Sequence, residues 1–88
     1  MNYIETLKGK YLITEQGRSN IRSLLAYRGT CLLNIAPDTG WNYQKLYRIY
    51  RGMQSITMDE LKTLSDVIHD ATGHGIIELN CSVVGRLS

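Results

Sequence analysis

Residues 35 to 52 read IAPDTGWNYQKLYRIYRG, and this stretch decides the fold. Ala36 is small, as a residue must be where two helices cross closely, and Gly40 accepts the positive φ of a sharp turn. Asn42 is a strong N-cap for a helix that Gly52 ends. The stretch therefore predicts the end of one helix, a steep turn and a second helix.

The helix predicted over residues 42–51 has two unlike sides. Leu46 and Ile49 must face the core, and a turn of about 100° per residue leaves an opposite flank that holds no acidic residue. Glutamine reads adenine, arginine reads guanine or holds phosphate, and tyrosine offers its ring to a thymine methyl group. We expect base contacts in the major groove from the first turns of this flank, at Tyr43, Gln44 and Arg48, with Tyr47 on the same side. We expect phosphate contacts nearer its rims, at Asn42, Lys45 and Arg51.

The segment SNIRSLLAYRG predicts an earlier helix over about residues 20–28. Ser19 can cap its start and Gly29 can close its end. Aromatic side chains at helical spacing are usually part of a core, so Tyr27 and Tyr50 are both assigned to packing. The apolar face of this helix is expected to comprise Ile21, Leu24, Leu25 and Tyr27.

Thr30 can cap the helix that leads into the turn at Gly40. Pro37 has no backbone N–H, so we expect this helix to be kinked or to finish early.

The clearest helix signal follows, because Thr57 and Glu60 have the spacing of a capping box and Gly73 can end the helix. Its buried stripe is expected to comprise Leu61, Leu64, Val67, Ile68 and Ala71.

The hydrophobic period changes near the C-terminus, where apolar and polar residues alternate over residues 76–84. This two-residue repeat predicts a half-buried strand, which needs a partner strand. That partner is either the N-terminal segment, in which residues 11–13 can be extended, or the same strand of a second chain. The N-terminal segment also fits a short helix. We expect the C-terminal strand to join two chains through Ile77, Leu79, Cys81 and Val83.

The charge of the chain is unevenly distributed. Residues 18–58 hold six basic residues against Asp38 alone, whereas residues 59–88 hold two basic residues against five acidic ones. A basic middle beside an acidic flank indicates a polyanionic partner. No apolar run approaches the roughly 20 residues that cross a bilayer, and no secretory signal is seen at the N-terminus, so we expect no membrane contact and a cytoplasmic protein.

Catalysis and metal binding are not indicated. His69 and His74 have no partner at a recognised ligand or triad spacing, and there is no glycine-rich phosphate loop. Cys31 and Cys81 are far apart in the chain, and we expect both to be buried free thiols. We therefore expect no catalytic residue, no metal, no cofactor and no small-molecule substrate.

The run from Leu32 through Gly40 to Gly52 resembles the helix-turn-helix of the Cro and phage-repressor family, and the likeness extends over about residues 19–72. The resemblance implies a groove position for Tyr43, Gln44, Tyr47 and Arg48. It implies phosphate contacts at Arg51 and at the start of the preceding helix, here Thr30. Two residues depart from the family: Leu32 stands where a glutamine often clamps a phosphate, and Pro37 has no usual counterpart.

The sequence thus predicts a mainly α protein with four to five helices and one C-terminal strand. Residues 1–18 form an N-terminal extension, residues 19–74 a helix-turn-helix domain and residues 75–88 a dimerisation segment. The expected function is a homodimeric, sequence-specific transcriptional regulator, such as a repressor, bound to double-stranded DNA. The alternative is a protein-interaction module, similar to an inhibitor or antitoxin, that uses the same fold without reading DNA.

Overall fold

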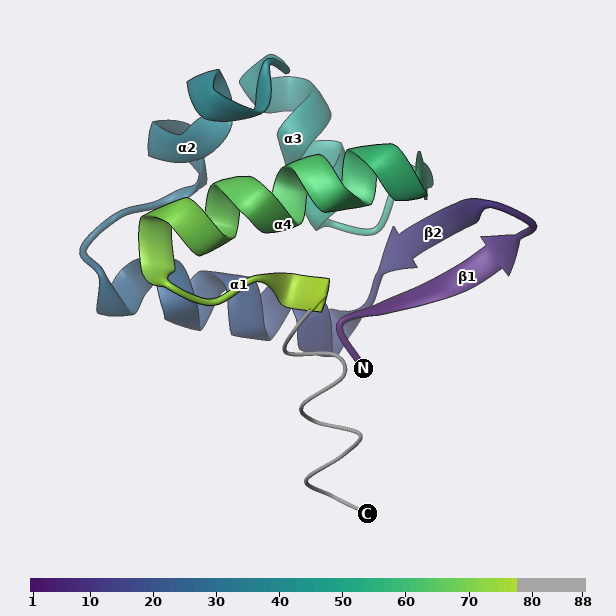
Figure 1. Ribbon diagram of the computed structural model, residues 1–88, viewed down its shortest axis with the longest axis horizontal. Coiled ribbons are helices and arrows are strands. Elements are labelled where there is room, and N and C mark those ends of the chain that lie inside the picture. The colour runs from purple at the N-terminus through teal and green to yellow at the C-terminus, as the bar shows by residue number, and fades with distance from the viewer. Residues whose placement is uncertain (78–88) are drawn as a thin grey trace.

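The computed structural model describes residues 1–77, which form four helices and a three-stranded antiparallel sheet (Figure 1). The expected helices are therefore present, but the sheet makes "mainly α" only part of the description. In chain order the elements are β1 (Tyr3–Leu7), β2 (Lys10–Ile13), α1 (Glu15–Tyr27), α2 (Leu32–Thr39), α3 (Tyr43–Tyr50), β3 (Ile56–Thr57) and α4 (Met58–Thr72).

The N-terminal segment, for which the sequence left strand and helix open, is a β-hairpin. Strands β1 and β2 pair antiparallel with Tyr3 opposite Ile13, and Gly9 takes a positive φ of 76° between them. The rings of Tyr3 and Tyr11 meet edge to face at 5.8 Å between centroids. Strand β3 pairs with the other side of β2, which places the hairpin against the start of α4. Strand β2 thus lies between β1 and a short internal strand that the sequence analysis did not predict.

Helix α1 begins five residues earlier than expected. Its N-cap is Thr14, whose hydroxyl accepts a hydrogen bond of 3.0 Å from the Gly17 N–H, so Ser19 lies inside the helix instead of capping it. The prediction for Tyr27 was also wrong, because its side chain is 85% exposed. Tyr27 is the last residue of α1, whose buried residues are Gly17, Ile21 and Leu25.

Helix α2 corrects two further expectations. Its N-cap is Cys31, which makes no side-chain capping bond, and not Thr30. The helix continues through Pro37 to Thr39, so the prediction of an early end was wrong. Gly40 then takes the left-handed conformation that the sequence predicted, with φ of 80°. The hydroxyl of Thr39 accepts from the Trp41 N–H at 3.0 Å and so supports the turn.

Helices α3 and α4 follow the prediction closely. Asn42 caps α3, and its Oδ1 accepts from the Lys45 N–H at 2.7 Å. Thr57 and Glu60 form both hydrogen bonds of the capping box at the start of α4, and Gly73 ends that helix with φ of 85°. The predicted stripe of α4 is buried except for Ala71, which is half-buried.

The core lies where the four helices and the sheet meet. In Figure 1, α2 and α3 lie on one side of α4, α1 lies on the other side, and the hairpin extends from one end. The fully enclosed aliphatic side chains come from α1, α3, β3 and α4, together with one residue after α4. They are Ile21, Leu46, Ile49, Ile56, Leu61, Leu64, Ile68 and Ile76.

The described chain ends beside its own N-terminus. The Nδ2 of buried Asn2 donates to the Ile76 carbonyl at 3.0 Å, and the Asn2 carbonyl accepts from the Thr14 N–H at 3.0 Å. Ile76 and Ile77 are helical, so the strand predicted from residue 76 does not begin there. Ile76 is completely buried and belongs to the core. The predicted contact residues Leu79, Cys81 and Val83 lie outside the described residues.

Candidate nucleic-acid interface

Helix α3 presents the predicted polar flank to solvent. Leu46 and Ile49 are completely buried and hold one side of the helix against the core. On the other side Gln44 and Arg48 are exposed, and the side chains of the tyrosines are 39% exposed at position 43 and 40% at position 47. We call Tyr43, Gln44, Tyr47 and Arg48 the reading face. All four predicted base-contact residues therefore lie on one accessible side of one anchored helix.

A row of aromatic rings stiffens this helix side. The ring centroid of Tyr47 lies 5.9 Å from that of Tyr43 and 6.4 Å from that of Tyr50. The guanidinium carbon of Arg51 lies 5.9 Å from the centre of the Tyr47 ring, within reach of a cation–π contact. Tyr50 is half-buried and packs against the core, as expected. These ring contacts restrict the rotamers that the tyrosines can adopt.

Arg48 is positioned by a residue that the sequence analysis did not single out. Its Nε donates to the Oε1 of Gln54 at 3.3 Å. Gln54 lies in the loop after α3 and is half-buried. The bond uses one of the five N–H groups of the guanidinium, so the others remain available for a base edge or a phosphate. No sequence pattern predicts this hydrogen bond, because only the path of the loop after α3 brings positions 48 and 54 together.

Lys45 has partners within the protein. Its Nζ lies 3.2 Å from the Oε2 of Glu60 in an ion pair and 5.1 Å from the centre of the Trp41 ring. The hydrogen bond from the Thr57 N–H, helped by the Lys45 ammonium, holds the pKa of Glu60 below its ordinary value of 4.5, although partial burial opposes this. Lys45 thus ties α3 to the start of α4, and its role as a phosphate contact stays a prediction.

We expect this contact to make stability depend on pH. A carboxylate whose pKa is depressed in the folded state contributes stability above its unfolded pKa and loses it as the pH falls through the folded pKa. Unfolding free energy should therefore decline in acid, and Glu60→Gln should remove up to about 1 kcal/mol of that decline, because glutamine still accepts from Thr57 but has no carboxylate to protonate. Urea unfolding of both proteins at about pH 7 and about pH 3 measures the change in unfolding free energy. Identical pH dependence in both proteins would contradict the assignment.

The other predicted phosphate contacts lie around the reading face. Asn42 is exposed, with its Oδ1 engaged in capping α3. Thr30 is half-buried just before α2, and its hydroxyl accepts from the Asn34 Nδ2 at 3.3 Å. Arg51 is exposed, while its carbonyl accepts from the Arg18 guanidinium at 2.8 Å. Arg51 is the cation among these three residues, and its guanidinium also lies over the Tyr47 ring.

A basic hollow that the sequence did not predict adjoins Arg51. It has a volume of about 380 Å³ and lies between α1 and the end of α3. Three arginines face a single carboxylate in its lining, which comprises Glu15, Arg18, Ser19, Arg22, Tyr50 and Arg51. Arg18 and Arg22 are four residues apart on α1 and so share a helix face. That spacing was the available sequence signal for a basic face on α1, but only the structure places this face beside α3.

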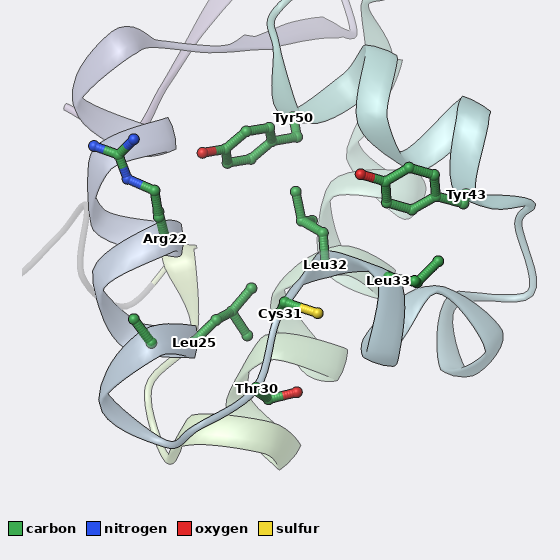
Figure 2. A pocket seen from close by; sticks show the side chains of 9 residues that line it. Arg22, Leu25, Thr30, Cys31, Leu32, Leu33, Tyr43 and Tyr50 are labelled. Atoms are coloured by element: carbon green, nitrogen blue, oxygen red, sulfur yellow. The ribbon is translucent and has the colours of Figure 1, made fainter.

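A second cavity, of about 370 Å³, lies between α1, α2 and α3 (Figure 2). Its lining is mostly apolar, and it reaches Tyr43 of the reading face and Arg22 of the basic hollow. Cys31 also lines it and is exposed, so the expectation of a buried thiol was wrong at this position, while Cys81 lies outside the described residues. The cysteine is exposed because the uncapped start of α2 lies at the surface.

Residues 1–77 lack two kinds of functional feature. Within this part of the chain no three His, Cys, Asp or Glu side chains gather as metal ligands would, and none of its helices is long and apolar enough to cross a bilayer. No protein-family model matches the chain, and comparisons with curated proteins and with solved structures gave no match.

Proposed function

We propose that the protein is a sequence-specific DNA-binding regulator in which α2, the turn at Gly40 and α3 act as a helix-turn-helix. One observation carries the proposal: the reading face is exposed on a helix whose opposite side is completely buried through Leu46 and Ile49. A rigidly held helix can enter a major groove about 12 Å wide and present side chains to base edges.

The chemistry of the reading face supports sequence readout. Gln44 can make paired hydrogen bonds to adenine, and Arg48 can do so to guanine. Tyr43 and Tyr47 offer apolar ring surface to thymine methyl groups and a hydroxyl to the backbone. No acidic residue lies within α3, so nothing on the helix itself repels the phosphates.

The basic hollow supports a path for the DNA backbone beside α3. Arg22 and Arg51 are exposed, and Arg18 is half-buried and donates to the Arg51 carbonyl. Basic side chains next to the reading helix hold phosphates and set its register without reading sequence. We therefore add Arg18 and Arg22 to the predicted phosphate contacts. Glu15 lies in the same lining and would weaken the attraction at that end.

A homodimer is part of the proposal. One reading helix contacts few base pairs, and two helices about 34 Å apart on one DNA face multiply the specificity. Leu79, Cys81 and Val83 remain our candidates for the contact between chains, whereas Ile77 is helical and packs against the core of its own chain. A protein that is monomeric in sedimentation at tens of micromolar would contradict this part of the proposal.

Selection of bound duplexes from a random pool tests the function directly. We expect an enriched motif with two-fold symmetry and half-sites about 10 base pairs apart, since each subunit reads one half. Affinity for the selected duplex should exceed affinity for random duplex by at least about a thousandfold. If the protein retained the pool of duplexes but enriched no motif, sequence-specific reading would be refuted. If it retained no duplex even at low salt, DNA binding itself would be refuted.

A protein-interaction module is the second candidate, favoured by apolar surface beside the reading face. Leu33 is 61% exposed on α2, close to Tyr43 at the rim of the apolar cavity. Such surface suits a protein partner better than a phosphate backbone. Binding to a protein with little dependence on salt, together with no retardation of any duplex, would establish this function instead.

A further inference from the structure

The cavity between α1, α2 and α3 has a mostly apolar lining to which all three helices contribute. Leu25 comes from α1, Leu32 and Leu33 come from α2, and Tyr43 and Tyr50 come from α3. Figure 2 shows these side chains around one common space. Its volume of about 370 Å³ is at the lower end of the range for small-molecule sites. An aliphatic floor offers no hydrogen bond to a base edge or a phosphate, which argues for an apolar occupant.

One cation stands at the rim of this cavity. Arg22 is exposed, and no hydrogen bond or ion pair joins its guanidinium to any residue in the described range 1–77. Tyr50 also lines the cavity, and in Figure 2 its hydroxyl points toward the Arg22 side chain. An arginine and a phenol together form a donor pair suited to a carboxylate.

We propose that this cavity binds a small aromatic carboxylate. The ring would lie on Leu25 and Leu32 beside the Tyr43 and Tyr50 rings, where burial of apolar surface and ring contacts both favour it. The carboxylate would accept hydrogen bonds from Arg22 and the Tyr50 hydroxyl at the solvent-facing rim. A single arginine matches a single negative charge, so a phosphate ester, which carries nearly two, fits less well.

Occupancy of this cavity regulates DNA binding, a part of the inference that rests on the proposed function. Arg22 lines both this cavity and the basic hollow, so a ligand carboxylate and a DNA phosphate compete for one guanidinium. Tyr43 belongs to both the cavity wall and the reading face, so the ligand also restricts a base-contacting side chain. A ligand that binds free protein better than DNA-bound protein lowers DNA affinity by the same factor.

Titration with 3-phenylpropionate tests the site without DNA. We expect saturable NMR shifts of the Leu25, Leu32 and Leu33 methyl groups with a dissociation constant on the order of 1 mM, as is usual for so small a ligand. The neutral isostere 3-phenylpropionamide should bind at least about tenfold more weakly, because it cannot form a charge-assisted hydrogen bond with arginine.

Two variants test whether Arg22 binds the ligand carboxylate. Arg22→Gln should reduce affinity for phenylpropionate at least about tenfold, because the cation is lost. The variant protein should then bind phenylpropionate and phenylpropionamide with equal affinity. Arg28→Gln is the matched control at the C-cap of α1: Arg28 is exposed but does not line the cavity, and its variant should bind as the original chain does. Equal binding of acid and amide by the original chain, or no methyl shift at about 10 mM ligand, would overturn the site. Methyl shifts that follow protein dilution but not ligand would overturn it in favour of an interface between copies.

The effect of the ligand on DNA binding is measured separately. On a selected duplex, saturating phenylpropionate should weaken DNA binding by about fivefold or more in the original chain and not in Arg22→Gln. Ligand binding without any change in DNA affinity would overturn the regulation and leave the site intact. Ligand binding by a protein that retains no duplex would refute the proposed DNA function and the regulation, but not the site.

Discussion

Alanine at both Gln44 and Arg48 should remove selective DNA binding and leave the fold intact. Each substitution deletes a paired contact to a base edge, for which we expect a loss of about 1 to 3 kcal/mol, or about 5- to 150-fold in affinity. The losses should fall on the selected duplex and be small on a random one, so specificity declines with affinity. Both side chains are exposed, so the melting temperature should hardly change. Fluorescence anisotropy on two matched duplexes gives both quantities.

Arg51→Ala is the matched control for this prediction. Arg51 is exposed like Arg48 but lies past the end of α3, beside the basic hollow. Its loss should weaken binding to all duplexes alike and reduce the dependence of log affinity on log salt by about one unit. If Gln44→Ala, Arg48→Ala and Arg51→Ala each lowered affinity equally on every sequence, the reading face would bind only backbone, and sequence readout by α3 would be refuted.

Gly17→Ala should destabilise the protein by about 2 kcal/mol or more, although alanine is the better helix former. A Cβ at position 17 would lie 2.0 Å from the backbone carbonyl oxygen of Asn2. That carbonyl also accepts from the Thr14 N–H, and the Asn2 side chain is bound to Ile76, so the N-terminus cannot move aside alone. In a domain of this size the melting temperature should fall by roughly 10 °C.

The control for Gly17→Ala is Ser23→Ala, at an exposed position on the same helix. It gains helix propensity without meeting another atom, so it should leave stability equal or slightly higher. Thermal unfolding followed by circular dichroism compares the two variants. If Gly17→Ala were as stable as the original chain, the N-terminal strand would not dock on α1 as described.

Local signals explain which helices could be predicted. The ends of α3 and α4 depend on caps next to them in the chain, namely Asn42 for α3, and Thr57 with Glu60 for α4. The start of α1 was predicted late because its cap, Thr14, is followed by Gly17, which has low helix propensity. Gly17 is tolerated because the backbone of Asn2 lies against it, and that contact comes from the other end of the hairpin.

The sheet and the surroundings of the reading face required the folded chain. Strand β3 has only two residues, Ile56 and Thr57, and no two-residue repeat can be seen in so short a segment. Lys45 was expected to be free for phosphate, but the packing of α4 places Glu60 beside it. Arg18 and Arg22 were counted in the basic middle of the chain, yet their position next to Arg51 depends on how α1 packs near α3.

The sequence by itself determined the turn at Gly40, the limits of α3 and which side of α3 faces the core, because caps, glycine conformations and helical periodicity act over a few residues. Only the tertiary structure decided which charged side chains remain free, and that α1, α2 and α3 border an open apolar cavity that reaches Arg22. Contacts between segments far apart in the chain depend on the packing of whole elements, and no local pattern specifies them.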